Sequence, residues 1–269
     1  MTSMSRRKNT KALQKATFRR PTEDCRQVLD IGCGTGDFTR DVLLPWNHPC
    51  TKVVAVDASS AMVDYAKANF GHPAICYDVL DLGAPDVFMF VEKYGRFDRI
   101  YSFFCLHWIR DQEAAFRNIS GLLNDGGEAL LVFSAQFVLY DVWMEMAAME
   151  RWKDILDDPT KLFPDTWQRE PPPSVGELEM SVRNLVTKAG MVIVACDVSP
   201  KKYRYRNDEE VLALLATLVT VKSGTPKEKE DCMREELSSR LLGGCTRTPT
   251  GCSFHSHLFT LHAQKASEN

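Results

Sequence analysis

Three glycines and a distant carboxylate are the residues of this chain that most clearly point to chemistry. The stretch Val28–Asp37 reads VLDIGCGTGD, with Gly32, Gly34 and Gly36 following an apolar run. A second apolar run, VVAVD, ends at Asp57. Glycine permits the tight bend and the close backbone approach that a nucleotide-binding loop needs. An acid at the end of the second strand can accept hydrogen bonds from both hydroxyls of a ribose. A chance glycine-rich turn is the alternative, but the correctly spaced acid favours a nucleoside site.

The loop chemistry favours a ligand that has a ribose but no phosphates. Asp37 stands where the dinucleotide fingerprint has its third glycine, and the Lys-Ser/Thr pair of a phosphate loop is missing. S-adenosylmethionine fits better, because its ammonium suits carbonyls and acids and its carboxylate suits loop amides. Asp81 is the candidate for the adenine amino group, with Leu82 supplying backbone. The predicted cofactor-binding residues are Asp30, Gly32, Cys33, Gly34, Gly36, Asp57, Ala58, Asp81, Leu82 and Phe103.

The acceptor side depends on what the methyl group is transferred to. Methyl transfer from a sulfonium is an in-line displacement, so the protein chiefly holds donor and acceptor about 3 Å apart and excludes water. An amine, phenol or carbon acid also requires a base, whereas a carboxylate is already ionised at neutral pH and requires hydrogen-bond donors. After the fourth predicted strand, His107 could act as a base and Trp108 offers one N–H donor. A structural histidine and a core tryptophan are the alternative interpretations.

The elements that would position these residues alternate between strands and helices. The predicted strands cover 27–31, 52–57, 74–80, 97–103, 128–134, 191–198 and 253–263, with a turn over 124–127. The predicted helices cover 37–44, a segment capped by Ser59 or Ser60 and closed by Gly71, 112–123, 177–189, 207–221 and 226–242. This order predicts an α/β fold with a doubly wound, mostly parallel, seven-stranded sheet and helical lid insertions.

The chain divides by composition into a leader, a core and two insertions. We expect a basic segment over 1–24 that could cap the site, a cofactor-binding core over 25–134, and a helical lid insertion over 135–176. The rest of the core covers 177–269 and contains a second helical insertion over 199–252. The lid is rich in Met and aromatic residues, which could either face a ligand or form ordinary core.

Charge and cysteine content narrow the class of protein. The net charge of the 269 residues is −3, yet residues 1–20 hold seven basic residues and no acid, which leaves 26 basic and 36 acidic residues after them. An acidic body argues against nucleic acid as a partner. We interpret the leader as a solvated basic arm, with a mitochondrial presequence as the alternative.

No apolar run or signal peptide predicts membrane insertion or export. The nine cysteines lack any C-x-x-C spacing, which favours a reducing compartment, and we expect a cytoplasmic location. The cluster of Cys245, Cys252, His255 and His257 matches no zinc pattern, so we predict no metal.

Several segments resemble juvenile hormone acid O-methyltransferases. They are CLHWIRDQ over 105–112, AFRNI over 115–119, LLVF over 130–133, and 9–15 with its Leu-Gln-Lys. The resemblance implies the class I methyltransferase fold and methylation of the carboxylate of farnesoic or juvenile hormone acids. It also implies that Gln14 and Trp108 hydrogen-bond that carboxylate. The stretch from Gln14 to Asp30 is shorter than in that family. A methyltransferase for another small acceptor, or a silent binding protein of the same fold, is the alternative.

Overall fold

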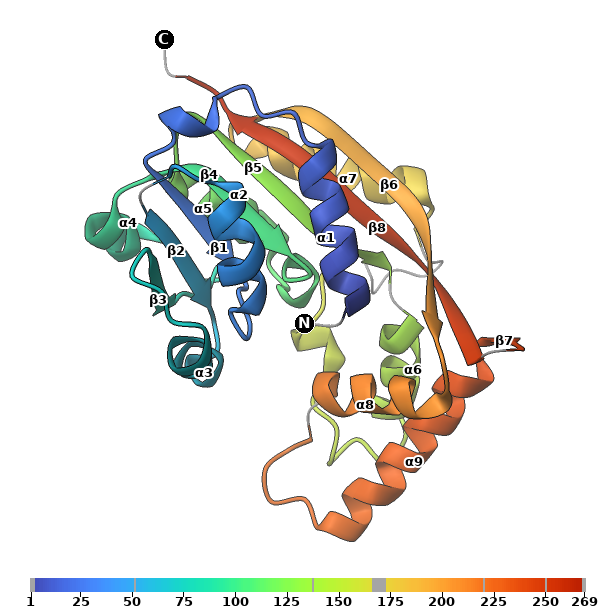
Figure 1. Cartoon of the computed structure of the whole chain (residues 1–269). Helices are drawn as coiled ribbons and strands as arrows, with labels where there is room; N and C mark the ends of the chain where they lie inside the picture. The colour runs from blue at the N-terminus through green and yellow to red at the C-terminus, as the bar shows by residue number, and fades with distance from the viewer. Residues whose placement is uncertain are drawn as a thin grey trace. The chain divides into compact units, whose positions relative to one another are not determined.

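The computed structural model describes residues 3–50, 52–136, 138–165, 173–219, 221–249 and 251–267 (Figure 1). The chain forms two compact units. The first comprises Met1–Phe133, Pro173–Val198 and Phe259–Asn269, and the second comprises Ser134–Pro172 and Ser199–Leu258.

A mostly parallel sheet organises the fold in the order β3-β2-β1-β4-β5-β8-β6, and a short β7 pairs with β8. Its strands are β1 (Gln27–Ile31), β2 (Lys52–Asp57), β3 (Ile75–Val79), β4 (Phe97–Phe103), β5 (Leu123–Gln136), β6 (Met191–Tyr205), β7 (Thr246–Thr248) and β8 (Gly251–Lys265). The pairs β1–β2, β1–β4, β2–β3 and β4–β5 are parallel, and β7–β8 is antiparallel. The predicted α/β class and seven-stranded path are confirmed, with β7 as an addition.

The helices are α1 (Ser3–Lys15), α2 (Leu44–Trp46), α3 (Ser60–Phe70), α4 (Phe88–Tyr94), α5 (Gln112–Leu122), α6 (Val138–Ala147), α7 (Val175–Lys188), α8 (Asp208–Leu218) and α9 (Lys227–Gly243). Local sequence explains where several of them begin. The Ser59 hydroxyl accepts the Met62 N–H at the start of α3. Ser174 and Glu177 form a reciprocal capping box at the start of α7. No helix in the described ranges is both long and apolar enough to cross a bilayer.

The predicted helix after the glycine loop contains a wider turn. Residues Thr39–Leu43 form a π-helix that leads into α2. Pro45 follows within α2 and has no N–H to donate to the carbonyl four residues earlier, so a regular α-helix would lack that bond here. The wider turn lies directly after the loop that we expect to bind the cofactor, where such bulges are frequent.

The turn predicted over 124–127 is instead a bulge inside β5. Phe97 pairs with Leu123, while Arg99, two residues further along β4, pairs with Glu128. Gly126 adopts a φ of 70°, which a side chain would disfavour. Strand β5 pairs with β4 both before and after these glycines. The glycines therefore form a bend within one strand.

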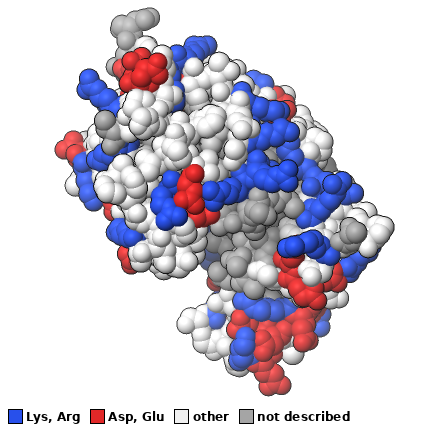
Figure 2. Space-filling model, viewed as in Figure 1, with Lys and Arg blue, Asp and Glu red and all other residues white. Residues whose placement is uncertain are grey.

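The prediction of a solvated N-terminal arm is wrong. Residues of α1 are buried at Asn9, Ala12 and Leu13, and exposed basic side chains occupy the outer face. Figure 2 shows Lys and Arg side chains gathered where Figure 1 draws α1. The apolar stripe was too short to identify from sequence, because the inner face mixes an amide, an alanine and a leucine.

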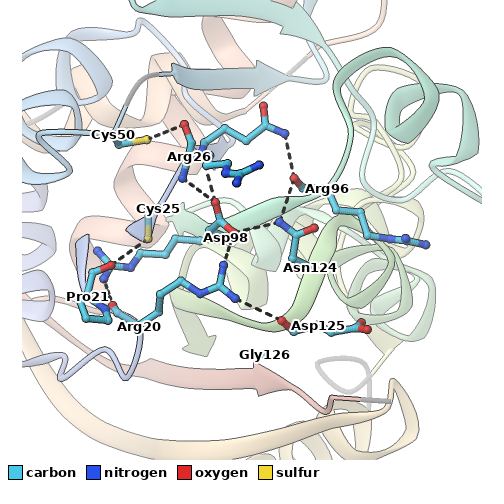
Figure 3. Close-up of polar contacts among 12 residues, drawn as sticks. Arg20, Pro21, Cys25, Arg26, Cys50, Arg96, Asp98, Asn124, Asp125 and Gly126 are labelled. Atoms are coloured by element: carbon cyan, nitrogen blue, oxygen red, sulfur yellow. Dashed lines mark hydrogen bonds and ion pairs between the residues drawn. The ribbon is translucent and has the colours of Figure 1, made fainter. Parts of the chain in front are cut away.

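Residues 16–26, which we call the strap, connect α1 to β1 through a buried polar network. The Asp98 carboxylate accepts hydrogen bonds from Arg20, from the backbone N–H of Arg26 at 2.8 Å and from the Asn124 amide at 3.0 Å (Figure 3). Asp98 is only 4% exposed. The strap is thereby attached to the beginning of β4, the end of the strand opposite the one that carries the predicted site.

The strap also packs through an aromatic ring. The Phe18 ring lies edge-on to Tyr101 with centroids 5.9 Å apart, and the Arg99 guanidinium lies 4.3 Å from its centre. The backbone N–H of Arg19 donates to both oxygens of the buried Glu128, at 2.9 and 3.0 Å. The strap is therefore attached to β4 and β5 on the surface of the first unit, with Cys25 as its buried residue.

The second unit has a core of its own, built from the Met and aromatic residues of the predicted lid. Trp143, Met146 and Phe163 are fully buried. The Trp143 and Phe163 rings meet edge to face at 5.7 Å, and the Trp143 indole N–H donates to the Asp157 carbonyl. These three side chains act as core in this unit. All nine cysteines are free thiols.

Candidate functional site

The glycine loop joins the carboxyl ends of β1 and β2. The N–H groups of Gly32 and Cys33 donate to the Val56 carbonyl at 2.8 and 2.9 Å. Gly32 and Gly36 have φ values of 76° and 81°. A Cβ on Gly32 would lie 2.5 Å from the Cys105 Cβ, and one on Gly36 would lie 2.7 Å from the Tyr77 hydroxyl. Both glycines are therefore required by the packing of the protein itself.

Gly34 differs from its two neighbours. Its φ is 55°, and a Cβ built on it would meet no atom within 4 Å. Its N–H donates to Oδ2 of Asp57 at 3.0 Å. The space above Gly34 is thus left open by the protein, as expected where backbone must approach a ligand closely.

Asp57 connects the loop to the start of α3. Its Oδ1 accepts the Ser59 N–H at 3.0 Å, in addition to the Gly34 bond. Each carboxylate oxygen has two lone pairs, so capacity remains for two ribose hydroxyls. Ala58, beside it, is exposed. The carboxylate therefore organises the loop and keeps acceptor sites.

Asp30 is a buried carboxyl at the end of β1. It is 3% exposed, and its Oδ2 accepts the Thr39 hydroxyl at 2.6 Å. Burial raises the pKa of Asp30 to about 7; the Thr39 bond opposes that rise, and nearby Asp57 and Asp37 add to it. A cation beside Asp30 would favour its ionised form. In its ionised form, this carboxyl could pair with an ammonium group.

The adenine candidates lie just after β3. Asp81 is exposed and its Oδ1 accepts the Gly83 N–H at 2.9 Å. Leu82 is 2% exposed, and its carbonyl accepts the amide of the buried Asn118 at 2.9 Å. Asn118 on α5 thus fixes this segment, a role that nothing in the sequence indicated.

The loop after β4 carries the acceptor candidates. Phe103, the last residue of β4, packs edge-on to Phe38 with ring centroids 5.2 Å apart. Phe104 has a φ of 58°, a strained conformation for a bulky residue. The Cys105 side chain packs against the backbone of Gly32, so the loop after β4 contacts the glycine loop.

His107 and Trp108 follow in a single 3-10 turn. His107 is 5% exposed, and burial lowers its pKa to about 3. Trp108 is half-buried, its backbone N–H donates to the Cys105 carbonyl at 2.9 Å, and its ring lies 5.3 Å from that of His107. His107 is therefore a neutral side chain near pH 7 and a weak base.

Gln14 is the candidate that α1 contributes. Its side chain is exposed on α1, whereas the buried face of that helix carries Asn9, Ala12 and Leu13. Arg6, near the start of α1, forms ion pairs with Asp41 at 3.5 Å and Asp37 at 3.9 Å. The first turns of α1 therefore adjoin the helix that follows the glycine loop. No motif or periodicity in the sequence predicts the Arg6 contact.

Comparison with known proteins agrees with this geometry. Residues 29–129 match the model of a methyltransferase domain. A juvenile hormone acid O-methyltransferase from Bombyx mori is 32% identical over 250 residues, which are 89% of this chain and 85% of that protein. The chain belongs to the juvenile hormone acid O-methyltransferase family. A second member of this family, from Drosophila melanogaster, is 34% identical over 49% of this chain and 44% of its own length.

Solved structures of other methyltransferase-fold proteins resemble the present chain in fold. The YcgJ protein of Bacillus subtilis has a TM-score of 0.56 at 17% identity, over 99% of this chain and 100% of its own. Phosphoethanolamine N-methyltransferase 2 of Haemonchus contortus, in complex with S-adenosylmethionine, has a TM-score of 0.52 at 16% identity, over 97% and 53%. The predicted class I methyltransferase fold is confirmed.

The protein is an S-adenosylmethionine-dependent O-methyltransferase. The residues present fit this cofactor, because an open space lies above Gly34 and acceptor capacity remains on Asp57. When bound, S-adenosylmethionine supplies an activated methyl group. The chain would hold its ammonium at Asp30 and its ribose at Asp57.

Replacing Asp57 with alanine should weaken S-adenosylmethionine binding by about 1.5–3 kcal/mol, or roughly 10- to 150-fold, because two ribose hydroxyls lose a charged acceptor. Calorimetric titration measures this change. Asp57→Asn keeps one carbonyl oxygen and should lose less than Asp57→Ala. Asp78→Ala is a control, because Lys93 and Tyr94 bond its carboxylate on β3 instead. Unchanged affinity in Asp57→Ala would contradict the ribose assignment.

Proposed function

We propose that this enzyme methylates the carboxylate of a long apolar acid such as farnesoic acid or juvenile hormone acid. The observation that carries the proposal is the 32% identity to the Bombyx mori enzyme over 85% of that protein's length. The buried, neutral His107 supports it, because a carboxylate acceptor needs no base. On this proposal, Trp108 holds the carboxylate through its indole N–H and His107 supports the turn that presents it.

The substrate class can be tested with one assay. The protein is incubated with labelled S-adenosylmethionine and, separately, with farnesoic acid, a fatty acid, an aromatic acid and a tricarboxylic acid. Labelled methyl ester from the apolar acids, and none from the tricarboxylic acid, is the expected result. Turnover of a phenol, with none of any acid, would overturn the proposal. Cofactor binding without turnover of any acceptor would identify a silent member of the fold.

The pH dependence separates a carboxylate from a proton-bearing acceptor. At saturating cofactor, kcat should remain nearly constant from about pH 6.5 to 8.5, because His107 with a pKa of about 3 stays neutral throughout. Saturation matters because Asp30, whose pKa burial raises to about 7, and the cofactor's own ammonium both titrate in this range. Initial rates of wild type and His107→Asn give the two profiles. A steep rise through neutrality that His107→Asn abolishes would identify His107 as a base.

Trp108→Phe should reduce kcat/KM for the acid by roughly 10- to 150-fold. The substitution keeps an aromatic ring but removes the N–H donor, so a buried carboxylate oxygen loses a bond worth about 1.5–3 kcal/mol. Steady-state kinetics measures the loss, and calorimetry should find cofactor affinity nearly unchanged. Equal activity in wild type and Trp108→Phe would mean that other donors hold the carboxylate.

A further inference from the structure

The acceptor turn, Leu106–Trp108, is a single 3-10 turn between β4 and α5. Two backbone hydrogen bonds close it. The Trp108 N–H donates to the Cys105 carbonyl at 2.9 Å, and the Ile109 N–H donates to the Leu106 carbonyl at 3.1 Å. The hydrogen-bond geometry of such a turn is poorer than that of an α-helix. The direction of the Trp108 side chain therefore depends in part on groups outside the turn that hold its two ends.

Gln112, the first residue of α5, holds the acceptor turn from outside. Its side-chain nitrogen Nε2 donates to the Leu106 carbonyl at 2.7 Å and to the Ile109 carbonyl at 2.5 Å. These two carbonyls stand on either side of His107 and Trp108 in the chain. An amide nitrogen carries two hydrogen atoms, so one side chain can satisfy both carbonyls and link the two ends of the turn.

The start of α5, which carries Gln112, is itself well anchored. The Asp111 side chain caps the helix by accepting the Ala114 N–H at 2.8 Å. Ala114 and Ala115 are 2% and 0% exposed, so α5 packs into the core from its first turn. The amide is therefore presented to the acceptor turn by a capped and buried helix.

A second amide of α5 holds the chain after β3 in the same way. Asn118 donates through Nδ2 to the Leu82 carbonyl at 2.9 Å and to the Ala84 carbonyl at 2.8 Å. Gly83 lies between these carbonyls, and a Cβ on it would lie 3.2 Å from Cγ2 of Ile109. The adenine candidates thus adjoin the residue that follows the acceptor turn. Helix α5 therefore orients both stretches of the site, through one amide for each.

We infer that Gln112 is a positioning residue for methyl transfer, which fixes the acceptor turn so that Trp108 presents its indole N–H to the acceptor at the correct angle. This inference rests on the proposed function. In-line displacement is sensitive to position, because a shift of about 1 Å can cost about 100-fold in rate. Without the amide, the two carbonyls lose their donor and the turn relaxes toward other partners such as water. The acid then still binds, but with its oxygen out of line with the methyl group.

Gln112→Met tests the inference, because methionine has a similar length and volume but no N–H donor. With farnesoic acid at saturating cofactor, kcat should fall about tenfold or more, while KM changes by less than about threefold. Calorimetry should find S-adenosylmethionine affinity within about twofold of wild type. Glu113→Met, the next position on α5, is the matched control. The Glu113 carboxylate is 62% exposed and pairs with Lys188 at 3.4 Å, so its loss should leave the kinetics unchanged.

A double-mutant cycle with Trp108→Phe distinguishes positioning from a purely structural role. If Gln112 acts through Trp108, adding Gln112→Met to Trp108→Phe should lower kcat/KM by at most about twofold more, because the donor that it orients is already gone. Losses that multiply would mean that the two residues act independently, which would overturn the inference. Urea unfolding gives a second readout. A purely structural amide would lower stability and leave kcat of the folded enzyme at the wild-type value, which would also overturn it.

The conservative variant Gln112→Asn keeps both N–H groups on a side chain that is one methylene shorter. Its kcat should lie between those of Gln112→Met and wild type, and the same cycle is run on it if Gln112→Met does not fold. If wild type turns over farnesoic acid and Gln112→Met matches its kcat, the inference alone fails. If wild type methylates no acid, the proposed function fails and the inference fails with it.

Discussion

Gly32→Val is expected to destabilise the protein and abolish cofactor binding at once. A Cβ at this position would lie 2.5 Å from the Cys105 Cβ, and the φ of 76° is one that a branched side chain strongly disfavours. The conformation costs about 1–2 kcal/mol and overpacking costs about 1–3 kcal/mol more. Denaturant unfolding should find the loss in stability, and calorimetry should detect no S-adenosylmethionine binding.

Gly34→Ala is the matched control for this effect. The new methyl would meet no protein atom within 4 Å, so the stability loss should be limited to the conformational cost of about 1–2 kcal/mol. If the open space holds the cofactor, affinity should nevertheless fall about tenfold or more. Full cofactor affinity in Gly34→Ala would show that the ligand lies elsewhere, and a stable Gly32→Val would contradict the contact with Cys105.

Asp98→Ala should lower the free energy of unfolding by about 1.5–3 kcal/mol, because it removes a buried carboxylate that accepts several hydrogen bonds. The carboxylate receives bonds from Arg20, the Arg26 and Gln27 backbones and the Asn124 amide, as Figure 3 displays for this network. Urea unfolding measures the change. Activity should also fall, because the strap that holds α1 loses its main attachment.

Two further variants make the Asp98 prediction specific. Asp98→Asn keeps the shape and one oxygen, so it should lose less than Asp98→Ala. Asp125→Ala removes a carboxylate that is 52% exposed and pairs with Lys265 at 3.5 Å, which should cost at most about 1 kcal/mol. A loss below that level in Asp98→Ala would mean that water satisfies the network.

The parallel core was predictable from sequence, because its signals are local. The bounds of β1, β2 and β4 match the predicted ranges residue for residue. The strands β1 and β2 are apolar runs that end at an acid or a glycine loop, and β4 is buried at every position although it contains Asp98, Arg99 and Ser102. The later strands extend beyond their apolar runs: β6 continues to Tyr205 and β8 to Lys265. Pairing between neighbours, rather than composition, determines their length.

The glycine loop and its acid were predictable for the same local reason, but the groups that hold them were not. Thr39 fixes Asp30, and Asn118 fixes Leu82 from a helix 36 residues away in the chain. These contacts depend on the tertiary fold. The seven-residue α4 went unpredicted because two turns carry too little periodicity.

The N-terminal helix shows how far chain length controls a site. Its orientation follows from the number of residues between α1 and β1 and from their ties to β4, neither of which a motif encodes. The contact between Gln14 and the substrate is implied by the family resemblance and stays a prediction; the side chain is exposed on α1.

Ala16 and Thr17, the two residues between α1 and the attached part of the strap, act as a pivot on a very short tether. Two residues span at most about 7 Å. If the contacts of Arg6 and Leu13 with the rest of the protein broke, α1 would therefore stay beside the sheet. The effective concentration of such a segment for its own docking site is of millimolar order. If α1 detached locally, it would therefore rebind in a first-order step that does not depend on protein concentration.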